Sequence, residues 1–170
     1  EALESKPASW ITQPGYSTSQ TNNCEIKTGS EAFILWGNGS ITTGNYDVSN
    51  GCEQIKISFD IKAESYNCND GWYNQYNSYY DFYIDYSDDN GSSWNNGSRY
   101  HYSSSYINWQ NKFRTVTISS SITNIKFRIR VVTTTSSGIG NYSSLKANYN
   151  QWFLDNIKIE SSIAGNWTNG

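Results

Sequence analysis

Hydrophobic and polar residues alternate with a period of two along several stretches of this chain. In residues 54–63 (QIKISFDIKA) every second residue is apolar, and the residues between them are polar or charged. Residues 124–133 (NIKFRIRVVT) repeat the pattern, with Ile125, Phe127 and Ile129 alternating with Lys and Arg. Strands of this kind cover a core on one side and meet water on the other, as in antiparallel sheets. Both stretches are therefore predicted to be half-buried strands.

The same alternation, in shorter form, predicts further strands along the chain. They are expected at residues 24–28, 32–36, 41–49, 79–86, 113–119 and 151–160. Clusters of Gly, Asn and Ser separate them, and no segment has helical periodicity of useful length. Short strands at regular spacing, divided by turn signals, are typical of two packed sheets. We predict an all-β, antiparallel two-sheet β-sandwich (jelly roll) of about eight or nine strands over residues 21–160.

Residues 87–94 (SDDNGSSW) lie between two aromatic-rich runs and are predicted to form a hairpin turn. Asn90-Gly91 is the strongest short hairpin signal, because a tight turn of this type needs positive φ, which Asn and Gly tolerate. Trp94 can fold back to cover the turn. We interpret the acidic octet as a turn and not as a catalytic or metal site.

The octet also resembles the Asp-box pattern Ser-x-Asp-x-Gly-x-x-Trp, which it matches at Ser87, Asp89, Gly91 and Trp94. The Asp-box recurs on hairpins of sialidases and of many extracellular β modules. The resemblance implies a device for folding the hairpin.

The order of elements over residues 24–160 resembles that of extracellular jelly-roll modules typified by meprin-type (MAM) domains, reelin-type repeats and related carbohydrate-binding modules. The segments that carry this resemblance are CEQIKISFDIKA, DFYIDYSDDNGSSW, WQNKFRTVTISSSITNIKFRIRVVTTT and QWFLDNIKI. The resemblance implies the sandwich fold. It does not imply one function, because this fold hosts sugar binding, adhesion and pure architecture.

Composition and charge narrow the function classes. The chain has 170 residues and a net charge of −3, without a basic patch that would indicate a nucleic-acid partner. Its sequence contains no apolar run long enough for a membrane span. The chain begins at Glu1 and contains no Met, so we expect a mature, processed protein or a piece cut from a larger one.

Sequons and cysteines favour an oxidising, extracellular compartment. Candidate N-glycosylation sites are Asn38, Asn90, Asn96, Asn141 and Asn166. The three cysteines, Cys24, Cys52 and Cys68, allow one disulfide and one leftover thiol. The sequence does not choose among the three pairings, and three reduced thiols are the alternative.

Asp155 is the candidate metal ligand. The alternation puts Asp155 on the face of Phe153, Ile157 and Ile159, so it is predicted to point inward, where a carboxylate must be paired or bound to a cation. The resemblance to carbohydrate-binding modules implies a structural calcium ion at this last strand, with many of its oxygen ligands from the backbone. The alternative is an Asp that is hydrogen-bonded and pins a neighbouring loop.

Aromatic clusters are the candidate sugar-binding residues. In residues 66–80, Trp72, Tyr73, Tyr76 and Tyr79 are the candidates, because pyranose C–H groups stack on aromatic rings. A similar group comprises Tyr100, Tyr102, Tyr106 and Trp109. The alternative is that these rings cover sheet faces or neighbouring subunits.

The polar residues do not predict catalysis. His101 is the single His and has no nucleophile context, so we expect it on the surface of a strand. Asp81 and Asp85 lie on the predicted polar face of their strand, where we expect them to meet Lys or Arg of a neighbouring strand. We predict that the protein is not an enzyme.

The role of the two chain ends distinguishes two hypotheses for a non-catalytic function. Residues 1–20 form an extended segment that can dock on its own domain or donate a strand to a neighbour, and residues 161–170 form a tail. Strand donation repeated head to tail produces a filament. We therefore predict a glycosylated, self-assembling subunit of an extracellular surface fibre. The alternative is a carbohydrate-binding or adhesion module of a larger secreted protein with a polysaccharide ligand.

Overall fold

The computed structural model describes residues 10–12, 16–19, 32–36, 39–64, 79–102, 107–134, 151–163 and 166–169. These residues form twelve strands. The strands are β1 Ile11–Thr12, β2 Tyr16–Ser19, β3 Ala32–Trp36, β4 Ser40–Thr42, β5 Tyr46–Asp47, β6 Gln54–Glu64, β7 Tyr79–Ser87, β8 Asn95–Tyr102, β9 Ile107–Thr117, β10 Asn124–Thr134, β11 Gln151–Ile163 and β12 Asn166–Asn169. The predicted strand at residues 24–28 lies outside the described residues.

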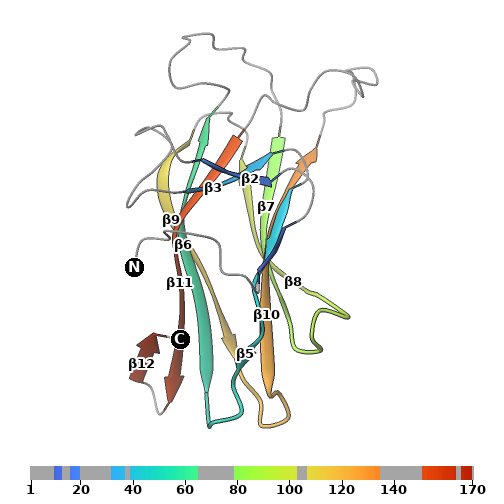
Figure 1. Cartoon of the computed structure of the whole chain (residues 1–170), viewed down its shortest axis with the longest axis vertical. Helices are drawn as coiled ribbons and strands as arrows, with labels where there is room; N and C mark the ends of the chain where they lie inside the picture. The colour runs from blue at the N-terminus through green and yellow to red at the C-terminus, as the bar shows by residue number, and fades with distance from the viewer. Residues whose placement is uncertain are drawn as a thin grey trace.

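The strands form two six-stranded sheets that pack face to face (Figure 1). Sheet A has the order β1-β4-β10-β7-β8, with β5 also paired to β10. Sheet B has the order β2-β3-β11-β6-β9, with β12 also paired to β11. Adjacent strands are antiparallel, and among the longer strands the chain crosses between the sheets from β6 to β7, β8 to β9, β9 to β10 and β10 to β11. The predicted all-β two-sheet sandwich is confirmed, with more short strands than expected.

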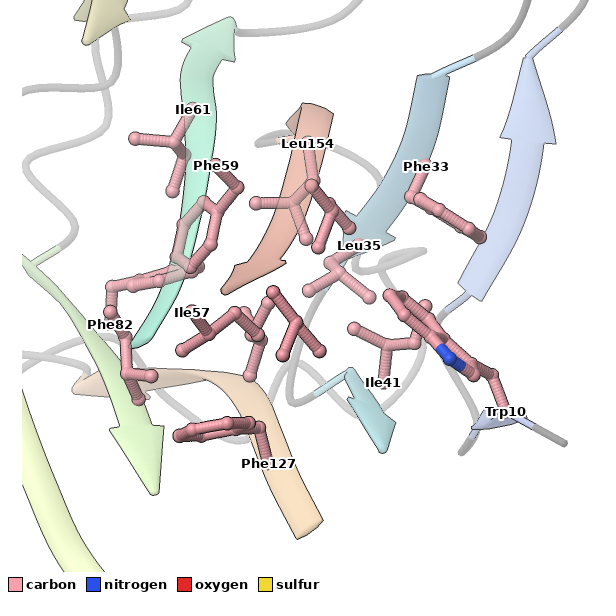
Figure 2. Packing of buried hydrophobic residues seen from close by; sticks show 14 of the residues in the cluster. Trp10, Phe33, Leu35, Ile41, Ile57, Phe59, Ile61, Phe82, Phe127 and Leu154 are labelled. Atoms are coloured by element: carbon pink, nitrogen blue, oxygen red, sulfur yellow. The ribbon is translucent and has the colours of Figure 1, made fainter. Parts of the chain in front are cut away.

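The core lies between the sheets and consists of the predicted apolar faces. From β6, Ile57, Phe59 and Ile61 are fully buried, and from β10 Phe127 and Ile129 are fully buried as well. Burying a side chain of this size stabilises the fold by about 1.5–3 kcal/mol. Figure 2 shows Ile57 and Phe59 of β6 facing Phe82 and Phe127 of sheet A, and the Phe59 and Phe82 ring centroids lie 5.5 Å apart.

A β-bulge in β11 changes which face Asp155 occupies. Asp155 is paired with Asp60 of β6, but the next regular pair joins Lys158 to Ser58, so β11 holds an extra residue there. Asn156 adopts a positive φ of 52° in this bulge. A bulge shifts the alternation of side chains by one position.

The bulge separates the residues that the sequence pattern placed on one face. Leu154 and Ile157 both join the core cluster between the sheets. Asp155 is fully buried, as predicted, but it shares the outer face of sheet B with its pairing partner Asp60. The prediction that Asp155 points into the core with Ile157 is therefore wrong.

The described parts of both terminal segments pair within the chain. β1 pairs with β4, and β2 pairs with β3. Trp10 is buried and stacks on Phe33 at 5.9 Å (Figure 2). At the other end, β11 continues to Ile163, and β12 folds back on it as a hairpin (Figure 1). These pairings correspond to the arrangement in which the tails dock on their own domain.

Tyrosines and basic side chains close the open side of the sandwich between β8 and β9. Lys112 lies over the Tyr100 ring at 4.7 Å, and the Arg114 guanidinium lies over the Tyr86 ring at 4.5 Å. The Tyr102 ring packs against Trp152 at 5.3 Å, and burial raises the pKa of the Tyr102 hydroxyl to about 12. Tyr100 and Tyr102 are thus partly buried and pack against the core.

No helix that could cross a membrane occurs in the ranges that the structure describes.

Candidate binding face of sheet A

The outer face of sheet A carries a compact set of charged and aromatic side chains, which we call the arginine face. Its members are Asp81, Tyr83 and Asp85 of β7, Trp94 of the following turn, Arg99 and His101 of β8, and Arg128 and Arg130 of β10. Residues that face one another across antiparallel strands share a side of the sheet. Arg128 is opposite Asp85, Arg130 is opposite Tyr83, and Tyr83 is opposite Arg99.

Asp85 is the centre of the arginine face. Its Oδ2 accepts hydrogen bonds from Nε and Nη2 of Arg128, at 3.0 and 2.7 Å, and from Nε of Arg130 at 2.6 Å. Its Oδ1 accepts a bond of 3.2 Å from the backbone N–H of Gly97. Burial by itself raises the pKa of this carboxyl, but the two arginines outweigh burial and hold the pKa below its ordinary value of 3.8. Asp85 is therefore an ionised, fully buried anchor for two guanidinium groups.

Aromatic rings hold the same two arginines from the side. The Arg128 guanidinium carbon lies 4.3 Å from the centroid of Trp94, and that of Arg130 lies 3.9 Å from the centroid of Tyr83. Cation–π contacts of this kind contribute about 0.5–2 kcal/mol each, depending on their exposure. Each guanidinium is thus fixed both by a carboxylate and by a ring.

Asp81 repeats the arrangement four residues earlier on β7, beyond Tyr83. Its Oδ2 accepts a hydrogen bond of 2.9 Å from Nη2 of Arg99, and its Oδ1 lies 2.9 Å from Nδ1 of His101. Burial opposes ionisation of Asp81, but Arg99 and His101 outweigh it and lower the pKa of the carboxyl. The predicted meeting of Asp81 and Asp85 with basic side chains of neighbouring strands is confirmed. Both carboxylates are buried, however, whereas the pattern placed them on a face open to water.

The hairpin turn at residues 87–94 borders this face. Asn90 and Gly91 adopt positive φ values of 65° and 93°. Ser87 Oγ accepts a 2.7 Å hydrogen bond from the Gly91 N–H, and Asp89 Oδ1 accepts a 2.8 Å bond from the Ser93 N–H. Hydrogen bonds from the Ser93 hydroxyl, the Ser93 N–H and the Ser87 hydroxyl lower the pKa of Asp89 to about 2. The octet forms the expected β7–β8 hairpin, and Trp94 links that turn to Arg128.

Gly97 allows β7 and β8 to approach where their register shifts, next to Asp85. A Cβ at Gly97 would overlap the carbonyl oxygen of Ile84 and crowd Nη1 of Arg114. Arg114 Nη1 donates to the carbonyl oxygens of Ile84 and Asn95. Only glycine fits at position 97.

Of the four aromatic candidates in residues 66–80, only Tyr79 is among the described residues. Trp72, Tyr73 and Tyr76 lie outside the described residues, and Tyr79 begins β7. The proposal that these residues bind sugar stays a prediction. Arg99, Arg128 and Arg130 were not singled out as site residues. The signal that could have found two of them is the run Lys126, Arg128, Arg130 on the polar positions of one strand.

Cys52 is a free thiol, half-buried, with its Sγ 3.1 Å from the carbonyl oxygen of Gln54. The two candidate disulfides that include Cys52 are therefore not formed. Cys24 and Cys68 lie outside the described residues, so their pairing stays a prediction.

Asp155 lies opposite Asp60, and Asn156 contacts both carboxylates. The Asn156 N–H donates to Asp155 Oδ1 at 2.6 Å, and its side-chain Nδ2 donates to Asp60 Oδ2 at 2.7 Å. Within the described ranges, no group of three or more His, Cys, Asp or Glu side chains could hold a metal ion. Calcium needs about six to eight oxygen ligands, and these residues do not supply such a shell. The calcium ion at Asp155 stays a prediction.

The fold and this face together define a class of protein, a two-sheet β-sandwich module with an exposed, polar sheet surface. The Reelin subrepeat B family matches residues 17–160, and the chain belongs to that family. The predicted resemblance to reelin-type repeats is thereby confirmed. No curated protein matches the chain in sequence.

Solved structures with the same fold include an adhesin and carbohydrate-binding modules. The K1 cleaved adhesin domain of Lys-gingipain from Porphyromonas gingivalis W83 has 13% identity, 97% coverage of both chains and a TM-score of 0.59. TmCBM61, solved in complex with β-1,4-galactotriose, has 12% identity, coverage of 91% of this chain and 90% of that chain, and a TM-score of 0.56. The CBM22-1–CBM22-2 tandem of Paenibacillus barcinonensis Xyn10C has 10% identity and a TM-score of 0.52, covering 98% of this chain and 45% of that chain. At these identities the likeness is one of fold.

Proposed function

We propose that the protein is a carbohydrate-binding or adhesion module of a larger secreted protein and that it binds without catalysis. The arginine face carries this proposal, because it combines fixed hydrogen-bond donors with aromatic rings on one exposed sheet surface. Donors satisfy sugar hydroxyls, and rings pack against the apolar C–H faces of a pyranose. The adhesin and carbohydrate-binding modules that share the fold support the same class of function.

An extracellular location belongs to this proposal. Asn90, Asn96 and Asn166 are exposed, so a glycosyltransferase would find these three sequons accessible. Asn38 and Asn141 lie outside the described residues. Family membership and the fold neighbours support a secreted module. A fibre subunit is less well supported, because β1, β2 and β12 pair within the chain.

The test is binding of the full chain to a glycan array and to gels that contain soluble polysaccharides, with β-1,4-galactan among them. Tyr83→Ala removes the ring beneath Arg130 and should weaken binding about tenfold, which corresponds to about 1.4 kcal/mol. Phe113→Ala is the matched control, because it removes an exposed ring from the outer face of sheet B. Unchanged binding by Tyr83→Ala would remove the arginine face as the site. An absence of binding to every glycan would end the proposal.

A further inference from the structure

The arginine face exposes donors and hides acceptors. Side-chain exposure is 56% for Arg99, 26% for Arg128 and 24% for Arg130, against 5% for Asp81 and 0% for Asp85. Solvent therefore meets guanidinium groups, while the carboxylates that orient them lie beneath. A ligand that docks here meets positive charge and N–H groups.

The arginine face is positively charged, whereas the whole chain is negatively charged. Three arginines face two carboxylates, whereas the chain as a whole has a net charge of −3. Both oxygens of Asp81 and both of Asp85 already accept hydrogen bonds. They hold the arginines in position, and because both carboxylates are buried they are not presented to a sugar hydroxyl.

The arginines retain donor atoms for a ligand. Arg130 uses only Nε in its bond to Asp85, so within the described part of the chain its Nη1 and Nη2 have no hydrogen-bond partner. Arg99 uses only Nη2, and Arg128 keeps Nη1. The planar fork of a guanidinium matches the oxygens of a carboxylate or sulfate in pairs. Because Tyr83 and Trp94 already fix two of these groups, little side-chain entropy is lost when a ligand binds.

We infer that the arginine face selects an anionic polysaccharide and recognises the carboxylate or sulfate groups along it. This inference rests on the proposed carbohydrate-binding function and adds the class of ligand. A polymer suits the face, because Arg99 and Arg130 flank Tyr83 in one row across the sheet, and Arg128 lies in the next outward-facing row, opposite Asp85. Successive acidic sugars can then contact successive guanidinium groups.

Affinity electrophoresis of the full chain at about 0.15 M salt, where long-range attraction is screened, separates the sources of negative charge. Polygalacturonate presents carboxylates, and its methyl ester is the uncharged match. Dextran sulfate presents sulfates, and dextran is its uncharged match. Polyglutamate presents carboxylates without sugar. We expect retardation by polygalacturonate or by dextran sulfate, and none by their uncharged matches or by polyglutamate.

Substitutions test whether that retardation depends on the arginine face. Arg99→Gln should weaken binding about tenfold, the loss of one charge-assisted hydrogen bond. Lys158→Gln removes the same charge from the outer face of sheet B and should leave binding unchanged. Arg130→Lys keeps the charge beside Asp85 but loses the planar fork, and should also weaken binding. Unchanged thermal melting of each variant checks that it is folded.

Any other result of these experiments contradicts the inference, and each result shows which part of it is wrong. Equal retardation by the uncharged matches leaves the proposed function standing and removes the anion selectivity. Equal retardation by polyglutamate reduces the effect to ion exchange. An equal loss in Lys158→Gln and Arg99→Gln removes the arginine face as its origin. If no polysaccharide, charged or neutral, retards the protein, the proposed function fails as well.

Discussion

The backbone N–H of Gly97 donates a hydrogen bond of 3.2 Å to Oδ1 of Asp85, which joins the register shift in β8 to the buried anchor of the arginine face. This contact requires β8 to lie so close to β7 that a side chain at position 97 would overlap the Ile84 carbonyl oxygen. One backbone position thus supports both the sheet edge and the orientation of two arginines.

Gly97→Ala should therefore lower the free energy of unfolding by about 3 kcal/mol, because backbone must move to admit the methyl group. Urea unfolding measures the change. Gly51→Ala is the matched control: Gly51 has a φ of 76° and open space around it, so its change costs about 1–2 kcal/mol of backbone strain alone. Equal losses in the two variants would show that close approach at Gly97 does not matter.

Asp85→Asn should lower the free energy of unfolding by about 3 kcal/mol, because it leaves Arg128 and Arg130 without their shared negative partner. The amide is nearly the same size as the carboxylate, so the loss reports charge and hydrogen bonding and not packing. Chemical denaturation measures the difference. Asp88→Asn, an exposed change in the adjacent turn, should have little effect. A stable Asp85→Asn protein would contradict the role of Asp85 as an anchor.

Stability should fall in acid in part because three carboxyls of the arginine face and its adjoining turn have lowered pKa values. Asp81 and Asp85 are held below 3.8 against burial by their basic partners, and Asp89 is held at about 2 by hydrogen bonds from Ser93 and Ser87. Since each folded-state pKa is lower than the unfolded one, the unfolded chain takes up protons first as the pH falls. The stabilisation is therefore complete above about pH 4–5 and is lost as the pH falls through the folded-state values. Unfolding free energies at a series of pH values should show this loss, with a smaller slope in Asp85→Asn.

Arg114→Met should loosen the side of the sandwich between β8 and β9. The variant keeps the aliphatic length but removes the donors to the Ile84 and Asn95 carbonyl oxygens and the contact with Tyr86. Loss of charged hydrogen bonds of this kind costs about 1.5–3 kcal/mol. Hydrogen exchange should become faster in β8. Protection that stays as high as in the parent would mean that Arg114 does not hold this edge.

Alkylation of the oxidised, folded protein should modify one cysteine, Cys52, because its thiol is free. We propose that Cys24 and Cys68 form the single disulfide, so two more sites should become reactive after reduction. Peptide mass spectrometry under non-reducing conditions distinguishes the outcomes. A linked peptide that contains Cys52 would contradict the structure, and a protein with three reactive thiols would remove the proposed disulfide.

The local sequence pattern predicted some structural features of the protein and missed others. The period-two alternation of residues 54–63 and 124–133 predicted the core faces of β6 and β10, because burial of one face requires that alternation. Asn90-Gly91 predicted the hairpin, because its backbone demand is local. The bulge at Asn156 interrupts the alternation without a change in composition, so Asp155 was placed on the wrong face.

The arginine face could not be predicted from local pattern either. Asp85 and Arg128 lie 43 residues apart in sequence and meet only because β7 and β10 are neighbours in sheet A.

By itself, the sequence determined the sandwich, its two apolar layers and the turn between β7 and β8, since each depends on residues close together along the chain. Tertiary structure alone decided that Asp81 and Asp85 are buried beneath arginines, that Tyr100 and Tyr102 pack against the core, and that β12 returns to β11. Those outcomes depend on which strands become neighbours and in what register. That choice is made by the packing of the whole domain and not by any one segment.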